Sequence, residues 1–163
     1  MSTADATTSI TIEHVTIPST KTFDVVRQAL EAAVPRLDPA SAALLQAGWV
    51  EEARKQIERA APLSIFGHRD HGALLRIAGL ERRAIQYDIG NPLTASRMTR
   101  HVLSAALYAP IRVLLREGAD GSVAFEYDRP VSSFGQFGDE AVDRVAQELD
   151  DQLHGALTAA AGR

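Results

Sequence analysis

The densest group of ionisable side chains in the sequence spans residues 68 to 71, where two histidines flank Arg69 and Asp70. A histidine in the first turn of a helix meets the partial positive charge of the helix dipole, which disfavours imidazolium and leaves a neutral ring able to act as base or ligand. His71 is therefore a candidate acid or base, with Asp70 as its orienting group. The alternative is that Asp70 only caps a helix while His68 and His71 lie in a solvated turn.

A metal site built on these residues would combine His68 and His71 with Asp70 or Asp88, because imidazole and carboxylate suit zinc or iron. Histidines three residues apart face the same side only within a helix, and Gly67 indicates that His68 precedes it. The sequence therefore predicts no metal site.

Haem is the other prosthetic group to weigh, with His68, His71 or His101 as an axial ligand. No haem-attachment motif occurs, and a lone histidine on an apolar helix is more often structural. The cofactor, if there is one, is not identified by the sequence.

Further polar positions could line a small-molecule pocket. Gly90-Asn91-Pro92 lies at an expected strand-to-helix turn, but the chain lacks G-x-G-x-x-G and GK[ST], and helix capping by Asn91 explains the tripeptide. Tyr127 follows Val123 and Phe125 at a spacing of two, so it shares their face, either packed in the core or with its phenol at a pocket edge.

Common nucleophile arrangements are missing, since there is neither a G-x-S-x-G elbow nor a cysteine.

The elements that must position these residues alternate along the chain. Apolar spacing and turn residues predict a strand and a helix, then a helical insert, and then strands and helices up to a long amphipathic C-terminal helix. In order, the expected elements are strand 10–17, helix 23–34, helical insert 39–60, strand 63–66, helix 71–78, strand 83–89, a helix through Met98, the hairpin strands 111–115 and 123–127, and helix 142–157.

This pattern predicts an α+β fold with a mixed sheet of about five strands. The crossover helices favour some parallel pairs, whereas the Gly118–Gly121 connection favours an antiparallel hairpin. The C-terminal helix is expected to cover one face of the sheet.

Length and composition narrow the class of protein. A chain of 163 residues fits one domain, here preceded by a flexible tail at residues 1–9, and buries roughly two thirds of its unfolded surface. The absence of cysteine excludes disulfides and thiolate metal sites and is typical of a reducing compartment, so we predict a cytoplasmic protein. A net charge of -4 without clustered arginines argues against nucleic acid, and no apolar run of membrane-spanning length or signal peptide is present, which argues against a membrane.

Several stretches resemble, in content and order, the domain-of-unknown-function 302 family over about Leu63 to Leu157. The matching stretches are Arg69-Asp70-His71, Asp88-Ile89-Gly90-Asn91-Pro92 followed six residues on by Met98, Ala109-Pro110-Ile111-Arg112-Val113-Leu114, and Gly121-Ser122-Val123 leading to Tyr127-Asp128-Arg129-Pro130. The resemblance implies a compact α+β domain that is often homodimeric, without an established activity. The chain departs from the family in the residues before Gly90 and in the helical segment before Leu63.

Two hypotheses follow. The first is a small-molecule site that uses His71 as acid or base on a small organic substrate. The second is a non-catalytic homodimeric accessory module whose insert at 39–60 engages another protein. The residues predicted for the first are His71, Asp70 and Tyr127 as catalytic groups and His68, Asp88 and Asn91 as ligand-binding groups.

Overall fold

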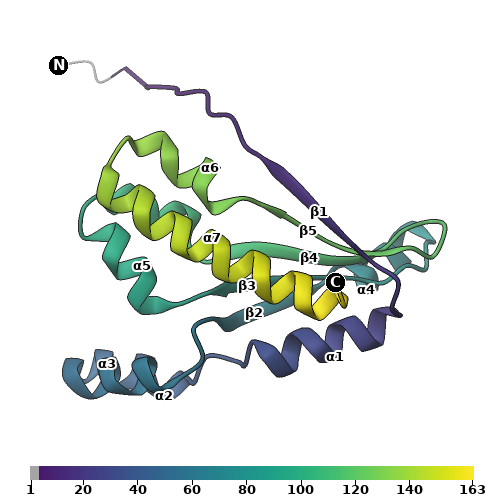
Figure 1. Ribbon diagram of the computed structural model, residues 1–163, viewed down its shortest axis with the longest axis horizontal. Helices are drawn as coiled ribbons and strands as arrows, with labels where there is room; N and C mark the ends of the chain where they lie inside the picture. Colours follow the sequence, from purple (N-terminus) through teal and green to yellow (C-terminus); the bar gives the residue numbers. More distant parts are fainter. Residues whose placement is uncertain (1–3) are drawn as a thin grey trace.

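Alternating apolar residues give the strands one buried and one polar face. In β3 (Ala84–Gly90), Ile85, Tyr87 and Ile89 are buried, whereas Gln86 and Asp88 between them are half-buried and point the other way. The computed structural model describes residues 4–163, in which five such strands form one sheet (Figure 1).

The order of elements is close to the predicted one. They are β1 (His14–Ser19), α1 (Phe23–Ala33), α2 (Pro39–Gln46), α3 (Val50–Arg59), β2 (Ser64–Asp70), α4 (His71–Leu75), η1 (Arg76–Ala78), β3 (Ala84–Gly90), α5 (Pro92–Thr99), η2 (Leu103–Tyr108), β4 (Ile111–Glu117), β5 (Val123–Asp128), α6 (Pro130–Phe134), η3 (Gly135–Phe137) and α7 (Glu140–Ala161). The α+β class, the β4–β5 hairpin and the long C-terminal helix are confirmed.

The expectation of a mixed sheet with parallel pairs is wrong. The sheet order is β1-β5-β4-β3-β2, and every pair of neighbouring strands is antiparallel. A parallel pair needs a crossover that returns the chain along the whole strand. The connection between β2 and β3, residues 71–83, contains only the short α4 and η1 and brings the chain back beside β2.

The first strand also differs from its prediction. β1 begins at His14 rather than at residue 10, and it includes Pro18, which was expected to end it. Because β1 is an edge strand, a proline there need not break a ladder on both sides. Residues 4–9 of the predicted flexible tail lie outside helices and strands and are exposed, whereas residues 1–3 lie outside the described residues.

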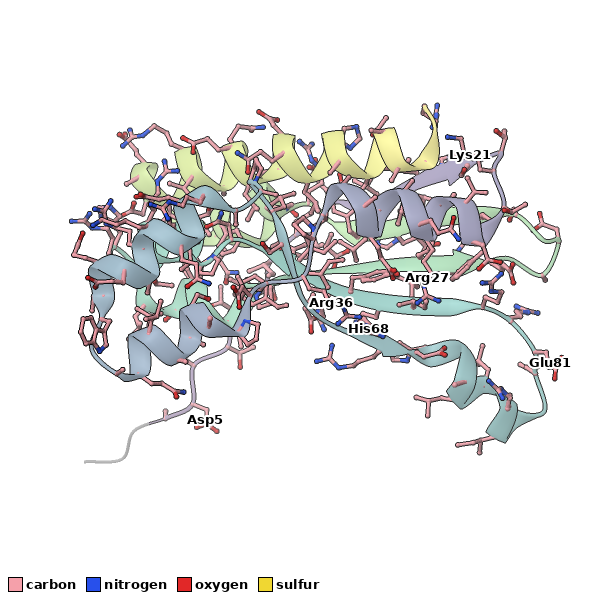
Figure 2. All side chains as sticks on the ribbon, turned by 90° about the horizontal axis from the view of Figure 1, so that it is seen from below. Asp5, Lys21, Arg27, Arg36, His68 and Glu81 are labelled. Carbon is pink, nitrogen blue, oxygen red and sulfur yellow. The ribbon has the colours of Figure 1, made fainter. Side chains whose placement is uncertain are left out.

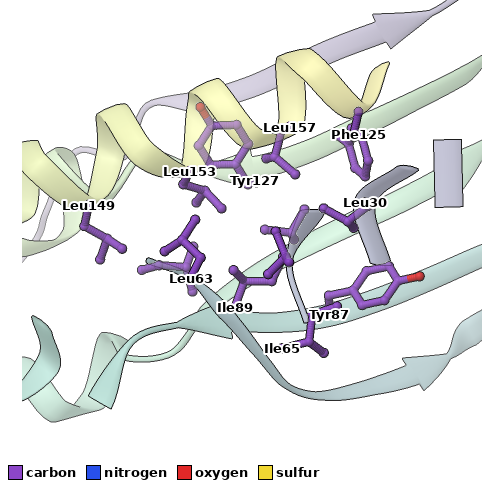
Figure 3. Close-up of a cluster of buried hydrophobic side chains, with 14 of the residues drawn as sticks. Leu30, Leu63, Ile65, Tyr87, Ile89, Phe125, Tyr127, Leu149, Leu153 and Leu157 are labelled. Atoms are coloured by element: carbon purple, nitrogen blue, oxygen red, sulfur yellow. The ribbon is translucent and has the colours of Figure 1, made fainter. Parts of the chain in front are cut away.

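The helices α1 and α7 lie on the same face of the sheet, while α2 and α3 lie beyond its β2 edge (Figures 1 and 2). Between α7 and the sheet, Leu149, Leu153 and Leu157 pack against strand residues such as Ile89 and Phe125 (Figure 3). The helical insert predicted at 39–60 is present as the two helices α2 and α3, and Asp38 caps α2 by accepting a bond from Ala40 N.

We call the opposite side of the sheet the open face. Its side chains come from alternate strand positions and are mostly charged; they include Arg69, Gln86, Asp88, Arg112, Arg116, Glu126 and Asp128. Within residues 4–163, no helix is both long and apolar enough to cross a membrane.

Candidate functional site

Asp70 and His71 lie where β2 passes into α4. Asp70 is the N-cap, and its Oδ1 accepts a hydrogen bond from Ala73 N at 2.9 Å. His71 is exposed in the first turn, with its Nε2 3.5 Å from Gln86 Oε1. The capping role of Asp70 is thus present, and its bonded oxygen is directed at the helix rather than at His71.

His68 points to the side of the sheet that carries Tyr87, its cross-strand neighbour. Its Nδ1 lies 3.1 Å from Arg36 Nη2. The two labelled side chains lie where the chain leaving α1 passes β2 (Figure 2). A guanidinium can only donate, so Nδ1 accepts and the ring proton sits on Nε2. His68 and His71 therefore have separate partners on different sides of β2.

Asp88 and Asn91 are each engaged by neighbouring groups. On the open face, Asp88 forms an ion pair with Arg69 at 2.9 Å. Asn91 caps α5, because its Oδ1 accepts from Leu93 N at 2.8 Å and Thr94 N at 3.3 Å, while its Nδ2 donates to Pro62 O at 3.0 Å. Both ends of the Asn91 amide therefore hold the β3–α5 turn.

Tyr127 lies on the covered face, away from the other predicted residues. Its ring is buried beside α7, and its hydroxyl points toward that helix (Figure 3). The hydroxyl lies 2.9 Å from His154 Nδ1. Burial raises the pKa of the Tyr127 phenol to about 12, and the nearby charge of Asp150 adds to the rise. The phenol is thus protonated at neutral pH, and its hydroxyl donates to His154 Nδ1 in the tautomer that carries the ring proton on Nε2.

Asp150 and Arg129 form an ion pair next to this phenol. Asp150 is 2% exposed, and Arg129 reaches its Oδ2 with Nη2 at 2.7 Å and with Nε at 3.2 Å. The hydrogen bond to Asp150 raises the pKa of Arg129, so the guanidinium stays charged. Arg129 Nη1 also donates to Glu13 Oε2 at 3.1 Å, which ties the segment before β1 to this cluster.

A hollow of about 430 Å³ opens over these groups. We call it the Tyr127 hollow; it lies between β1, the end of β5 and α7. Its lining residues are Val15, Tyr127, Arg129, Asp150, Asp151, His154 and Gly155. The Tyr127 phenol, the His154 imidazole and the Arg129–Asp150 ion pair lie at one wall, where they can donate and accept hydrogen bonds and can move a proton.

Sequence reasoning found Tyr127 but missed His154 and Asp150. Asp150 and His154 are four residues apart on α7, so they lie on the same side of the helix. The available signal was therefore a pair of polar side chains at helical spacing beside the apolar stripe that ends at Leu157. Within residues 4–163, no three histidine, aspartate or glutamate side chains are grouped so as to hold a metal ion.

The architecture is that of an α+β domain with helices packed on one face of an antiparallel sheet. Residues 46–160 match the sequence model of the domain of unknown function DUF302, so the chain belongs to the DUF302 family. This match begins before α3, whereas the motifs in the sequence located the resemblance only from Leu63.

A solved structure has the same fold. The crystal structure of the uncharacterized conserved protein DUF302 from Bacillus stearothermophilus superimposes with a TM-score of 0.64 and covers 88% of this chain and 94% of its own. At 16% sequence identity the likeness concerns the fold alone. No curated protein matches the sequence.

Proposed function

We propose that this protein is a small-molecule-binding domain whose ligand occupies the Tyr127 hollow, and that Tyr127 and His154 can act on that ligand as an acid–base pair. The observation that carries the proposal is the 2.9 Å bond between Tyr127 Oη and His154 Nδ1 at the wall of a hollow of about 430 Å³. Small-molecule sites are concave and contain a few convergent polar groups, as this hollow does.

The charges around the hollow suit a small polar organic molecule. Arg129 is neutralised by Asp150, and Asp151 accepts a bond from Gln147 Nε2 at 2.8 Å. The lining therefore carries no excess positive charge that would favour a strongly anionic ligand. Hydrogen-bonding groups of the ligand would face Tyr127 and His154.

The pair supports proton transfer without forming a phenolate. A ligand group could give its proton to Tyr127 Oη while Tyr127 passes its own proton to His154 Nδ1. The products are a neutral phenol, an imidazolium and a deprotonated ligand. Tyr127 then relays the proton, and His154 is the base that accepts it.

The test separates this site from one at His71. Native mass spectrometry of freshly purified protein, followed by NMR screening of a library of small polar fragments, should reveal bound molecules whose contacts include the Tyr127 hollow. We expect Tyr127→Phe and His154→Gln to weaken such binding, and His71→Gln to leave it unchanged. If only His71→Gln reduces binding, the ligand site lies at α4 instead, and the proposal for the Tyr127 hollow is wrong.

A second candidate function, a non-catalytic homodimeric accessory module, is favoured by a separate observation. Ile77 in η1 is 88% exposed and Leu107 in η2 is 81% exposed, at opposite ends of β3. Leu74, 57% exposed, lies with Ile77 on the surface of α4 and η1, and an exposed apolar patch of this kind is typical of contact with another protein. Light scattering should show a dimer that Ile77→Asp or Leu107→Asp dissociates, and a monomeric wild-type protein would rule out this module.

We also propose a compartment and a class of partner for this protein. The absence of cysteine supports a reducing compartment, and we place the protein in the cytoplasm. The net charge of -4 supports partners other than nucleic acid. Fractionation of cells that produce the tagged full chain would test the location.

A further inference from the structure

A small apolar pocket lies on the other side of α7 from the Tyr127 hollow. It is bounded by the β3–α5 turn, the start of β4 and α7, and its volume is about 90 Å³. Its walls include Ile89, Ala95, Met98, Pro110 and Leu149, with Phe66 at one side. We call it the Phe66 pocket.

Two polar side chains, those of Asn91 and Thr94, line this otherwise apolar pocket. The one amide among them, that of Asn91, has both ends in hydrogen bonds, to the α5 N-terminus and to Pro62 O. Within residues 4–163, the buried side-chain polar atom that lacks a hydrogen bond is Thr158 Oγ1, which does not line the pocket. A buried water needs two to four polar partners, so these walls favour an apolar occupant.

The volume sets the size of that occupant. A water molecule takes about 30 Å³ of the liquid, so the pocket of about 90 Å³ has the room of roughly three waters. A short alkyl group fits the available space.

Phe66 is placed to form the mouth of the pocket. The β2–β3 register shifts between Ile65 and Gly67, and such a bulge re-aims the side chain at the irregular position. Phe66 is 42% exposed. A Cβ on Gly90 would lie 3.7 Å from Phe66 Cε2 and 3.5 Å from Pro110 Cβ, so the ring and the proline close over Gly90 together.

We infer that the Phe66 pocket binds a short alkyl group, either as a free small molecule or as the alkyl end of a larger ligand. This site is separate from the Tyr127 hollow, although neighbouring residues of α7 serve the two: Leu149 lines the pocket, and Asp150 lines the hollow.

The test uses 1-butanol as the probe, 1,4-butanediol as the polar control and butyl β-D-glucoside as the larger ligand, titrated into methyl-labelled full-length protein. We expect saturable NMR shifts of the Ile89, Met98 and Leu149 methyls with 1-butanol and at least about tenfold weaker binding of the diol. Ala95→Leu, which fills the pocket, should weaken butanol binding by about tenfold or more, whereas Ala159→Leu on the exposed side of α7 should not.

The outcomes are distinguishable even if Ala95→Leu does not fold. Saturable shifts with 1-butanol but not with the glucoside indicate a free small molecule, and shifts with both indicate the alkyl end of a larger ligand. The inference is overturned if 1-butanol produces no saturable shift of these methyls in the wild-type protein. It is equally overturned if a folded Ala95→Leu variant binds 1-butanol as the wild type does.

Discussion

The Tyr127 hydroxyl and His154 Nδ1 lie 2.9 Å apart and join β5 to α7 across the gap between sheet and helix. Burial raises the pKa of the Tyr127 phenol to about 12, and the charge of the buried Asp150 carboxylate adds to the rise. The consequences of this cluster for stability and for proton position can be measured without knowing the ligand.

Tyr127→Phe should remove the bond to His154 and leave Nδ1 without its donor. The free energy of unfolding should fall by about 0.5–1.5 kcal/mol, the usual net worth of one hydrogen bond, as measured by urea denaturation. Tyr108→Phe is the matched control, because the Tyr108 ring packs edge-on against Phe134 and its loss of a hydroxyl should change stability less. Nitrogen NMR of His154 should register the change only in the Tyr127 variant.

Arg129→Met should be more costly because it leaves the Asp150 carboxylate buried without its cation. Fully buried pairs lose about 3–5 kcal/mol when one partner is removed. We expect about 2–3 kcal/mol, since the Arg129 side chain is 36% exposed.

Surface ion pairs provide the control for this prediction. Arg54 pairs with Glu51 and Glu58 on the outside of α3, so Arg54→Met should cost less than about 1 kcal/mol. Adding Asp150→Leu to Arg129→Met should recover much of the lost stability, because no uncompensated charge then remains. Equal losses of stability for Arg129→Met and Arg54→Met would show that the buried ion pair contributes no more to stability than a surface pair.

His14 should make stability depend on pH. Its hydrogen bond to Asp128 raises its pKa above the ordinary 6.5, and Glu126 contributes further. A raised pKa in the folded state means that the stabilisation is fully present below about pH 6.5 and is lost as pH rises through the folded value. The urea midpoint should therefore decline slightly between pH 6 and pH 8, and His14→Gln should remove that part of the decline.

Two glycine substitutions should act in opposite directions. A Cβ on Gly72 would meet Arg82 O at 2.6 Å and Ala84 N at 3.0 Å, so Gly72→Ala should destabilise the protein by about 1–3 kcal/mol. A Cβ on Gly155, within α7, would meet nothing within 4 Å, and Gly155→Ala should stabilise it by about 0.5–1 kcal/mol. Thermal unfolding of both variants would test these two predictions. A Gly72→Ala variant that is more stable than the wild type would show that the added Cβ is not crowded.

Local signals predicted the parts of the fold that depend on neighbouring residues. Asp70 and Asn91 were expected to cap helices, and both do so, because a cap depends only on the next two or three residues. The Gly118–Gly121 connection likewise predicted the β4–β5 hairpin.

The direction of strand pairing and the make-up of the hollow depend on distant parts of the chain. Residues 71–78 form α4 and η1 where a helix was predicted, yet β3 runs back beside β2, so the direction of pairing is set by packing and not by the local pattern. Tyr127 meets His154 only once α7 has packed on the sheet, so the period-two pattern of β5 could indicate the face of Tyr127 but not its partner.

The edge position of β1 has a consequence for how the chain is made. In the sheet of residues 4–163, β1 pairs with β5, so that His14 lies opposite Asp128, although β1 leaves the ribosome long before β5. In the sheet, β2 to β5 are neighbours in sequence order, so each of these strands can pair with the one before it. β1 can pair only after β5, the last strand, has been made. Vectorial synthesis therefore leaves this first strand without its partner until about four fifths of the sequence has been translated, and its docking is a late, high-contact-order step.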